Sequence, residues 1–273
     1  MNTVSTFHIH INGQVQGVGF RPFVFQQAQK FRICGWVSNA ADGLHIEFNA
    51  NELIARCVYA EIINNAPPLS HIISHGMRTV SFVRYDDFTI RESHNKGQPS
   101  LLLSPDFAMC AECRREVSDN TNRRYQYAFT TCTQCGPRYS ISEQLPYDRA
   151  NTTMKCFAMC ALCRAEYNNP GDRRHFSQTN SCPDCPVLMK LYNKDQDVIE
   201  ENQENISDRI TKLWQAGHIV AIKGIGGYLL TCDAGNAVTI RELRLRKHRP
   251  SKPFAIMFPD LHRLQKGVHL AEQ

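Results

Sequence analysis

Eight of the twelve cysteines form four Cys-x-x-Cys pairs, and no other feature of this 273-residue chain restricts its folding as strongly. The pairs that begin at Cys110 and Cys132 are separated by eighteen residues, and the same arrangement returns fifty positions later at Cys160 and Cys182. Two such pairs place four thiolates at the corners of a tetrahedron, which is the geometry of a structural zinc site. We therefore predict two bound Zn²⁺ ions, with these ligands: Cys110, Cys113, Cys132 and Cys135 in one module, and Cys160, Cys163, Cys182 and Cys185 in the other.

The repeat extends beyond the cysteines. Phe107-Ala108-Met109 matches Phe157-Ala158-Met159, and the pair Arg123-Arg124 matches Arg173-Arg174. A duplication explains this better than chance. One departure is Pro186, which follows the last cysteine where the first module has a glycine. It changes the turn and leaves the set of ligands intact.

Three other roles for the paired cysteines stay open: disulfides, a rubredoxin-like iron site and buried thiols without a metal. Disulfides need an oxidising compartment, and the start of the chain lacks the basic and apolar regions of an export signal. No run is long and apolar enough to span a membrane, so we expect a cytoplasmic protein without a membrane partner. Four thiolates accept iron as well as zinc. The isolated cysteines are expected to be small buried hydrophobes: Cys34, Cys57, Cys156 and Cys232.

A glycine-rich segment interrupts the regular pattern near the start of the chain. Phe7 to Ile11 alternate apolar and polar residues as a half-buried strand does, and three glycines then break the pattern between Gly13 and Gly19. Apolar residues at helical spacing follow, and Pro22 fits the first helical position, which would leave Arg21 in the loop. A helix N-terminus that follows glycines can bind an anion through free N–H groups, and Arg21 adds a charged donor at its rim.

The remaining elements of the first ninety residues predict a ferredoxin-like fold. A strand over 35–40 joins a strand over 44–49 through Asp42-Gly43, a strong hairpin signal, and a helix fits 52–63. Apolar stretches in 71–83 and 88–91 complete a β-α-β-β-α-β order. Because this fold occurs in proteins of many functions, the residues of the glycine loop are needed to distinguish between those functions.

The loop and the first hairpin carry a resemblance to a known family. Gly13-x-Val15-Gln16-Gly17-Val18-x-Phe20-Arg21, followed by Gly35-Trp36-Val37-x-Asn39-x-x-Asp42-Gly43, resembles the acylphosphatase signature. The resemblance implies that Arg21 holds the phosphate of an acyl phosphate and that Asn39 orients the attacking water, as the two catalytic residues. The alternative is that Arg21 is a surface cation and Asn39 a turn residue. The expected phosphate-binding residues are Gln16, Gly17, Val18, Gly19, Phe20 and Arg21.

The last seventy residues predict a second α/β region. A helical stripe from Ile206 ends near Gly217, a short strand covers 219–222, and a glycine-rich turn over 223–228 follows. A basic, proline-containing run then precedes a further predicted strand over 255–258, where cations on a stiff loop could hold a triphosphate. A plain β-turn and a solvated helix end are the alternatives. The candidate nucleotide-binding residues are Lys223, Arg244, Lys247, Arg249 and Lys252.

This region resembles the start of a YrdC-like domain, a twisted α/β unit that makes carbamoyl-adenylate-type intermediates from ATP. Lys223-Gly-Ile-Gly-Gly-Tyr and the Lys-x-Arg-x-x-Lys-Pro pattern around Arg249 carry the resemblance, which covers about the first third of such a domain. We expect a truncated YrdC-like domain, because too few residues follow to close a large sheet.

The net charge of +5 suits small anionic substrates as well as a polyanion. Only 241–252 approaches the basic density of a nucleic-acid surface, so a nucleic-acid partner is disfavoured. A zinc-ribbon RNA-binding protein and an enzyme of tRNA threonylcarbamoylation remain the rival functions. Neither accounts for the glycine loop that ends at Arg21.

Taken in order, these segments are similar to the HypF family of carbamoyltransferases in [NiFe]-hydrogenase maturation. Further likeness lies in Cys135-Gly136-Pro137-Arg138 and in Pro146-Tyr147-Asp148-Arg149. The resemblance implies hydrolysis of carbamoyl phosphate, formation of carbamoyl-adenylate with ATP and Mg²⁺, and transfer to a cysteine of a HypE-type partner for cyanide-ligand synthesis. We expect only acyl-phosphate hydrolysis from this chain itself.

The predicted class is α+β multidomain. Its parts are a ferredoxin-like βαββαβ acylphosphatase domain over 1–92, duplicated four-cysteine zinc modules over 104–190 (110–135 and 160–185), and a truncated α/β YrdC-like domain over 203–273.

Overall fold

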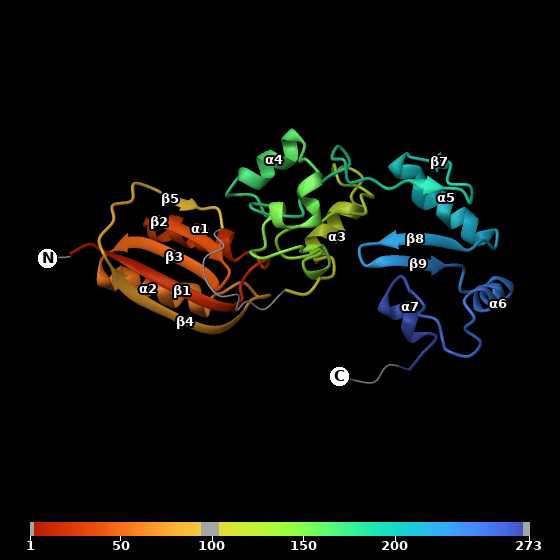
Figure 1. Cartoon of the computed structure of the whole chain (residues 1–273), viewed down its shortest axis with the longest axis horizontal. Coiled ribbons are helices and arrows are strands. Elements are labelled where there is room, and N and C mark those ends of the chain that lie inside the picture. The colour runs from red at the N-terminus through yellow and green to blue at the C-terminus, as the bar shows by residue number, and fades with distance from the viewer. Residues whose placement is uncertain (1–2, 94–103, 270–273) are drawn as a thin grey trace. The chain divides into compact units, whose positions relative to one another are not determined.

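A computed structural model describes residues 3–93 and 104–269 and divides the chain into two compact units (Figure 1). The first unit is Met1–Met189 and the second is Lys190–Gln273. The first two and last four residues of the expected domains lie outside the described residues. None of the helices in the described ranges is long and apolar enough to cross a membrane.

The first unit begins with a five-stranded sheet that two helices cover on one face (Figure 1). The strand order is β4-β1-β3-β2-β5, in which only the β2–β5 pair is parallel. This confirms the ferredoxin-like prediction, with β5 as an added edge strand. The bounds are β1 Ser5–Gln14, α1 Phe20–Phe31, β2 Cys34–Ala40, β3 Gly43–Ala50, α2 Glu52–Asn64, β4 His71–Val80 and β5 Phe88–Ile90.

Alternation along the strands places the core between the sheet and its helices. In β1, Phe7, Ile9 and Ile11 are buried, whereas the intervening His8 and His10 are half-buried on the opposite face. Eighteen buried apolar residues form one continuous cluster. At about 25 cal/mol per Å² of apolar surface, burial of such a cluster is the main favourable contribution to folding of this domain, and it offsets the conformational entropy that the chain loses.

Two local predictions about this domain were wrong. Helix α1 begins at Phe20, so Arg21 lies inside the helix and Pro22 in its first turn. The first four N–H groups of a helix have no intrahelical partner, so proline is tolerated there. The β2–β3 turn consists of residues 41 and 42, one position earlier than predicted, and Gly43 already pairs with Ala40. A Cβ on Gly43 would lie 2.3 Å from the Ile11 carbonyl oxygen, so close strand approach explains this glycine.

The remainder of the first unit holds two similar modules with little regular structure. Each contains one helix, whose N-cap is a cysteine sulfur that accepts the N–H of the next cysteine, at 3.5 Å in both modules. The elements are α3 Ala111–Ser118, η1 Tyr139–Ile141, η2 Arg149–Asn151, η3 Thr153–Cys156 and α4 Ala161–Asn168. In each module the buried cluster around the metal site consists of three cysteines, so an apolar core contributes little there.

The second unit contains two short hairpins and three helices among its described residues. Its buried apolar residues include Ile206, Val220 and Leu243. Its elements are β6 Leu191–Tyr192, β7 Val198–Glu200, α5 Gln203–Gln215, β8 Val220–Gly224, β9 Gly227–Thr231, α6 Ala237–Arg246 and α7 Leu261–Gln265.

Three expectations outside the sheet domain need correction. The glycine-rich turn predicted over 223–228 is limited to residues 225 and 226, because β8 extends to Gly224 and β9 begins at Gly227 in a tight antiparallel hairpin. The strand predicted over 255–258 is absent, since none of these residues pairs with a described strand. The isolated cysteines are not buried, because Cys57 and Cys156 are exposed and Cys34 and Cys232 are half-buried.

Candidate functional site

The loop between β1 and α1 positions Arg21 at the start of a helix. Gly17 and Gly19 have positive φ angles of 73° and 80°, and Gly19 is the N-cap of α1. Side chains are rarely accommodated at such angles, so the glycines allow the tight turn into the helix. The free N–H groups of the first turn and the helix dipole then favour an anion beside Arg21.

Arg21 is buried and paired. Its side chain is 7% exposed, and its Nη2 donates to Oδ1 of Asp148 at 2.6 Å. Its Nη1 donates to the Ser93 hydroxyl at 3.3 Å, and the guanidinium carbon lies 5.5 Å from the ring centroid of Phe176. Asp148 precedes η2 and Phe176 belongs to the second module, so residues outside the sheet domain neutralise and cover this cation.

Asn39 lies near the end of β2 and lines the same cavity as Arg21. It is 2% exposed, and its side-chain oxygen has no hydrogen-bond partner among the described residues. A buried polar atom without a partner costs about 1–3 kcal/mol, so such atoms usually mark a site for a water or a ligand. The oxygen can accept a hydrogen bond from a water held in this cavity.

Gln16 is engaged in holding the loop. Its Nε2 donates to the Ala40 carbonyl at 2.8 Å, and its Oε1 accepts the backbone N–H of Tyr147 at 2.9 Å. Its backbone carbonyl accepts the hydroxyl of Ser104 at 2.6 Å. The side chain of Gln16 therefore connects the glycine loop, the β2 end and the segment between the modules, and only its backbone remains to face an anion.

The cavity around Arg21 and Asn39 has a volume of about 30 Å³. A single water needs about 10–15 Å³, so there is room for about two or three waters. Of the residues expected to bind phosphate, Val18 is absent from the lining. The lining consists of Val15, Gln16, Gly17, Gly19, Phe20, Arg21, Pro22, Asn39, Thr133, Arg138, Tyr147, Phe176, Ser177 and Gln178.

Arg138 attaches the first module to the glycine loop. Its Nε donates to the Gly17 carbonyl, and its other nitrogens donate to carbonyls of residues 132, 133, 135 and 137 at 2.8–3.2 Å. A Cβ on Gly17 would lie 2.9 Å from the Arg138 side chain, so this glycine also makes room for the arginine. Nearby, burial raises the pKa of Tyr147, which keeps its phenol neutral.

The sulfur positions fit two tetrahedral metal sites. In the first module the distances are 3.7 Å for Cys110–Cys132, 3.8 Å for Cys132–Cys135 and 3.5 Å for Cys113–Cys135. A Zn–S bond of about 2.3 Å requires sulfurs about 3.8 Å apart. In the second module the sulfur–sulfur distances are 3.6 Å for Cys160–Cys182 and 4.0 Å for Cys182–Cys185. None of the twelve cysteines forms a disulfide, so the disulfide alternative has no support.

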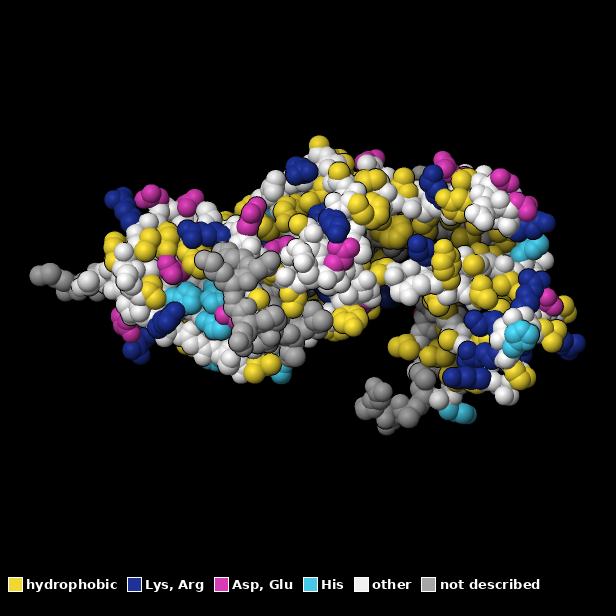
Figure 2. Space-filling view, viewed as in Figure 1, with side chains coloured by type: hydrophobic (Ala, Val, Ile, Leu, Met, Phe, Trp, Pro, Cys, Tyr) yellow, Lys and Arg dark blue, Asp and Glu magenta, His cyan; other side chains and the backbone are white. Residues whose placement is uncertain are grey.

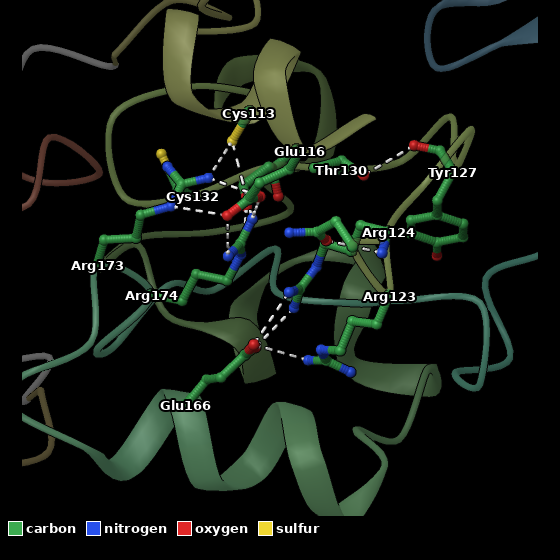
Figure 3. A network of polar contacts seen from close by, with 12 residues as sticks. Cys113, Glu116, Arg123, Arg124, Tyr127, Thr130, Cys132, Glu166, Arg173 and Arg174 are labelled. Carbon is green, nitrogen blue, oxygen red and sulfur yellow. Dashed lines mark hydrogen bonds and ion pairs between the residues drawn. The ribbon is translucent and has the colours of Figure 1, made fainter. Parts of the chain in front are cut away.

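Each module sends two arginines to the metal site of the other (Figure 3). Arg173 donates to the Cys113 sulfur at 3.1 Å, and Arg174 binds Glu116 with its Nη groups. Reciprocally, Arg123 donates to the Cys163 sulfur at 3.2 Å, and Arg124 binds Glu166 at 2.6 Å. We call these two sets the arginine clamps. The first consists of Cys113, Glu116, Arg173 and Arg174, and the second of Cys163, Glu166, Arg123 and Arg124.

The clamps balance charge around buried thiolates. Four thiolates around one Zn²⁺ carry a net charge of −2, and a guanidinium that donates to a sulfur offsets part of it. Burial raises the pKa of Glu166, but hydrogen bonds from Arg124 and Arg123 outweigh it and lower this pKa to about 2. The same opposition of burial and two arginines lowers the pKa of Glu116. Both carboxylates are therefore ionised at neutral pH.

The candidate nucleotide-binding cations lie in the second unit, and two of them bind the local backbone. Arg244 donates to the carbonyls of residues 249 and 252, and Arg249 donates to those of 252 and 253. Both guanidinium groups lie over the ring of Phe254 at 4.8 and 5.3 Å. Lys247 and Lys252 are exposed, and Lys223 lies 5.9 Å from the Tyr228 ring centroid. The loop is thus stiffened by its own arginines.

Sequence reasoning missed the residues that close the cavity from the modules. Asp148, Tyr147 and Arg138 lie in segments that carried only family likeness, and Phe176 and Gln178 lie in no motif at all. Their separations from Arg21 and Gly17 exceed one hundred residues, so spacing alone could not connect them.

Family models match three parts of the chain. Residues 7–90 match the model described as acylphosphatase, and residues 109–142 and 159–187 match the model described as HypF finger. Residues 212–273 match the model described as telomere recombination. The finger model and the donor geometry together fit zinc at both tetrathiolate sites.

Relatives cover nearly the whole chain. Carbamoyltransferase HypF of Synechocystis is 44% identical over 94% of this chain, and probable carbamoyltransferase HypF of Methanocaldococcus jannaschii is 45% identical over 91%. The chain spans 33% and 32% of these proteins, about a third of their length. The acylphosphatase of Pseudothermotoga lettingae is 34% identical over 30% of this chain, which covers 92% of that protein.

A solved structure of full-length HypF in a phosphate- and nucleotide-bound form matches with a TM-score of 0.88. The identity is 41%, over 97% of this chain and 34% of that one. These comparisons confirm the predicted likeness to the HypF carbamoyltransferases.

Proposed function

Because the chain belongs to the HypF family and its residues 7–90 to the acylphosphatase family, we propose that it hydrolyses carbamoyl phosphate in the cavity around Arg21 and Asn39. One observation carries the proposal: a buried guanidinium and an unpartnered amide oxygen line one cavity beside a glycine loop at a helix N-terminus. Phosphate oxygens suit the first group and the helix, and a water suits the second.

The proposed reaction needs no covalent intermediate. Arg21 and the N–H groups of the first helical turn hold the phosphate oxygens, and Asn39 accepts a hydrogen bond from the attacking water. Cleavage of the mixed anhydride by this water gives carbamate and inorganic phosphate. Donors fixed before the reaction stabilise charge on the phosphate without reorganising, which is the usual main source of such catalysis.

Substrate binding requires a change at Asp148. Its carboxylate oxygen Oδ1 lies 2.6 Å from Nη2 of Arg21, where a phosphate oxygen would bind. The remaining cavity has room for waters only. A phosphate is also an anion and can replace the carboxylate on the guanidinium. Asp148 is 24% exposed, so it can turn toward solvent when the phosphate enters. The pair therefore keeps Arg21 neutralised until substrate arrives.

The later steps of the proposed pathway concern the second unit and the parts of the relatives that this chain does not span. We assign carbamoyl-adenylate formation with ATP and Mg²⁺ to a YrdC-like site, with Lys223, Arg244, Lys247, Arg249 and Lys252 as candidate phosphate contacts. Transfer to a cysteine of a HypE-type partner would follow, for cyanide-ligand synthesis. The proposed compartment is the cytoplasm, where tetrathiolate sites stay reduced.

Phosphate release from carbamoyl phosphate tests the hydrolytic step. Arg21→Ala should lower kcat by about 10²–10³, as loss of one transition-state donor does. Asn39→Ala should lower kcat more than it raises KM, because the water and not the substrate loses its partner. Arg32→Ala, an exposed arginine just after the same helix, is the matched control and should leave turnover unchanged. Equal turnover in Arg21→Ala and Arg32→Ala would contradict the proposal.

A further inference from the structure

Three histidines and one aspartate meet on the sheet face opposite the helices. His8 and His10 come from β1, His45 from β3, and Asp42 from the turn before β3. Figure 2 shows histidine side chains gathered on one patch of this domain. The patch belongs to neither the cavity around Arg21 nor the two cysteine sites.

Strand pairing brings these side chains together. His10 and His45 are direct partners in the β1–β3 register, and their rings stack at 4.5 Å. The ring of His8 also stacks on His45, with ring centroids 5.2 Å apart. Because side chains on one face recur every second residue, this register alone fixes the three imidazoles in a row. The two-residue turn then places Asp42 beside His45.

The donor atoms have the separation that a small metal ion requires. His45 Nε2 lies 2.9 Å from one carboxylate oxygen of Asp42, and His10 Nε2 lies 3.8 Å from the other. One donor atom each from His10, Asp42 and His45 lie within 4.8 Å of one another. Zn–N and Zn–O bonds of about 2.0–2.2 Å place tetrahedral ligands about 3.3–3.6 Å apart, which lies between the two observed distances.

The surroundings supply the outer contacts that metal-binding histidines need. His8 Nε2 lies 3.1 Å from His45 Nδ1, so it can accept a hydrogen bond from that nitrogen when His45 Nε2 binds a metal. Asn12 donates to the Asp42 carbonyl at 2.8 Å and fixes the turn.

We propose that His10, His45 and Asp42 bind one divalent first-row transition metal of the kind that imidazole and carboxylate prefer, with His8 as the residue that positions His45. Three protein ligands leave one position open. The side chains of His10, Asp42 and His45 are 40%, 32% and 21% exposed, so solvent reaches that position. The site differs in this from the closed, buried tetrathiolate sites, and its metal should exchange readily.

Calorimetric titration of Zn²⁺ into the zinc-replete chain tests this site. The wild type should bind one Zn²⁺ beyond the two held by the cysteines. Asp42→Asn and His45→Gln should each weaken this third site by at least tenfold, and His8→Gln should weaken it by about 10–100-fold as loss of an outer contact does. Asn-Gly is a favoured hairpin pair, so Asp42→Asn preserves the turn before Gly43.

His75→Gln is the matched control, because His75 lies on β4 of the same sheet and bonds to Tyr59 outside the cluster. It should leave the third site unchanged, and metal analysis should find two zinc ions in every variant after dialysis against a weak chelator. Absence of a third site in the wild type overturns the proposal. Equal affinity in the wild type and Asp42→Asn overturns it as well.

Discussion

The sheet domain and the two cysteine modules reach a folded state by opposite means. In the sheet domain, Ile46 and Phe48 are fully buried members of an eighteen-residue apolar cluster. In the modules, Cys113 and Cys163 are as deeply buried, but their neighbours are other cysteines and guanidinium groups. The comparison teaches that burial alone does not identify the source of stability. The core of the sheet domain is stabilised by buried apolar surface, whereas the cysteine clusters of the modules are stabilised by metal coordination and by ion pairs.

Removal of zinc should produce the largest difference in stability between the two regions. Structural zinc contributes apparent binding free energies of about 10–16 kcal/mol in finger peptides, and the described residues of the modules form no apolar cluster large enough to replace it. A strong chelator should therefore unfold residues 104–189 and leave the sheet domain folded. Hydrogen exchange followed by mass spectrometry measures both regions in one experiment. Loss of protection in β1 together with α3 would show that the regions unfold as one.

Truncation of the apolar core should have the next largest effect. Ile46→Ala removes a fully buried side chain at the centre of the sheet and should lower the free energy of unfolding of this domain by about 2–5 kcal/mol. The zinc content should stay at two ions per chain, because the cysteine ligands belong to separate buried clusters. Val4→Ala, at an exposed position of the same region, is the control for chemical denaturation. A loss of zinc in Ile46→Ala would break the comparison.

The arginine clamps allow a finer test within the modules. Glu116→Gln and Glu166→Gln each remove a carboxylate that binds two arginines, and each should cost about 1.5–3 kcal/mol of module stability. The loss should be slightly larger for Glu166→Gln, because Glu166 also accepts a hydrogen bond from the Asn180 amide at 3.1 Å, whereas the corresponding Thr130 hydroxyl donates to the Tyr127 carbonyl. Thermal unfolding of the zinc-bound chain measures them. A loss of stability in one variant and none in the other would contradict the reciprocal role of the two carboxylates.

The smallest expected effect is on the surface of α2. Glu52 and Arg56 form an ion pair one helical turn apart, with both side chains largely exposed. Glu52→Gln should cost about 0.3–0.5 kcal/mol at low salt and less at about 1 M salt, where such pairs are screened. Denaturant titration at both salt concentrations checks this. A loss as large as that of Glu116→Gln would remove the distinction between buried clamps and surface pairs.

Local features of the fold could be predicted from the sequence because their causes are local. Strand alternation around Ile9, the glycine loop before Arg21 and the cysteine spacing each depend on neighbouring residues. The structure shifts the start of α1 by only two residues and the hairpin turn by one. The strand expected over 255–258 failed for a different reason: an apolar run forms a strand only when another strand pairs with it.

Long-range contacts could not be predicted in this way. The Arg21–Asp148 pair joins residues far apart in the chain, and the sequence around each residue does not indicate which residue it contacts. The repeated arginine pairs were visible in the sequence, but their targets across the modules were not. The histidine patch likewise depends on the register that sets His10 opposite His45, which alternation along one strand does not give.

The reciprocity of the arginine clamps has a consequence for the origin of the modules. Adding fifty to the numbers of the cysteine and the glutamate and subtracting fifty from those of the two arginines converts one clamp into the other. By the same exchange, the contact of Arg174 with the Thr131 carbonyl corresponds to that of Arg124 with the Ser181 carbonyl. Such a pattern is the contact rule of a twofold homodimer. The duplicated segment is therefore complementary to itself, so a duplication that joins two copies makes their association intramolecular and independent of protein concentration. A single module of this kind could complete its arginine clamp only with a second identical chain.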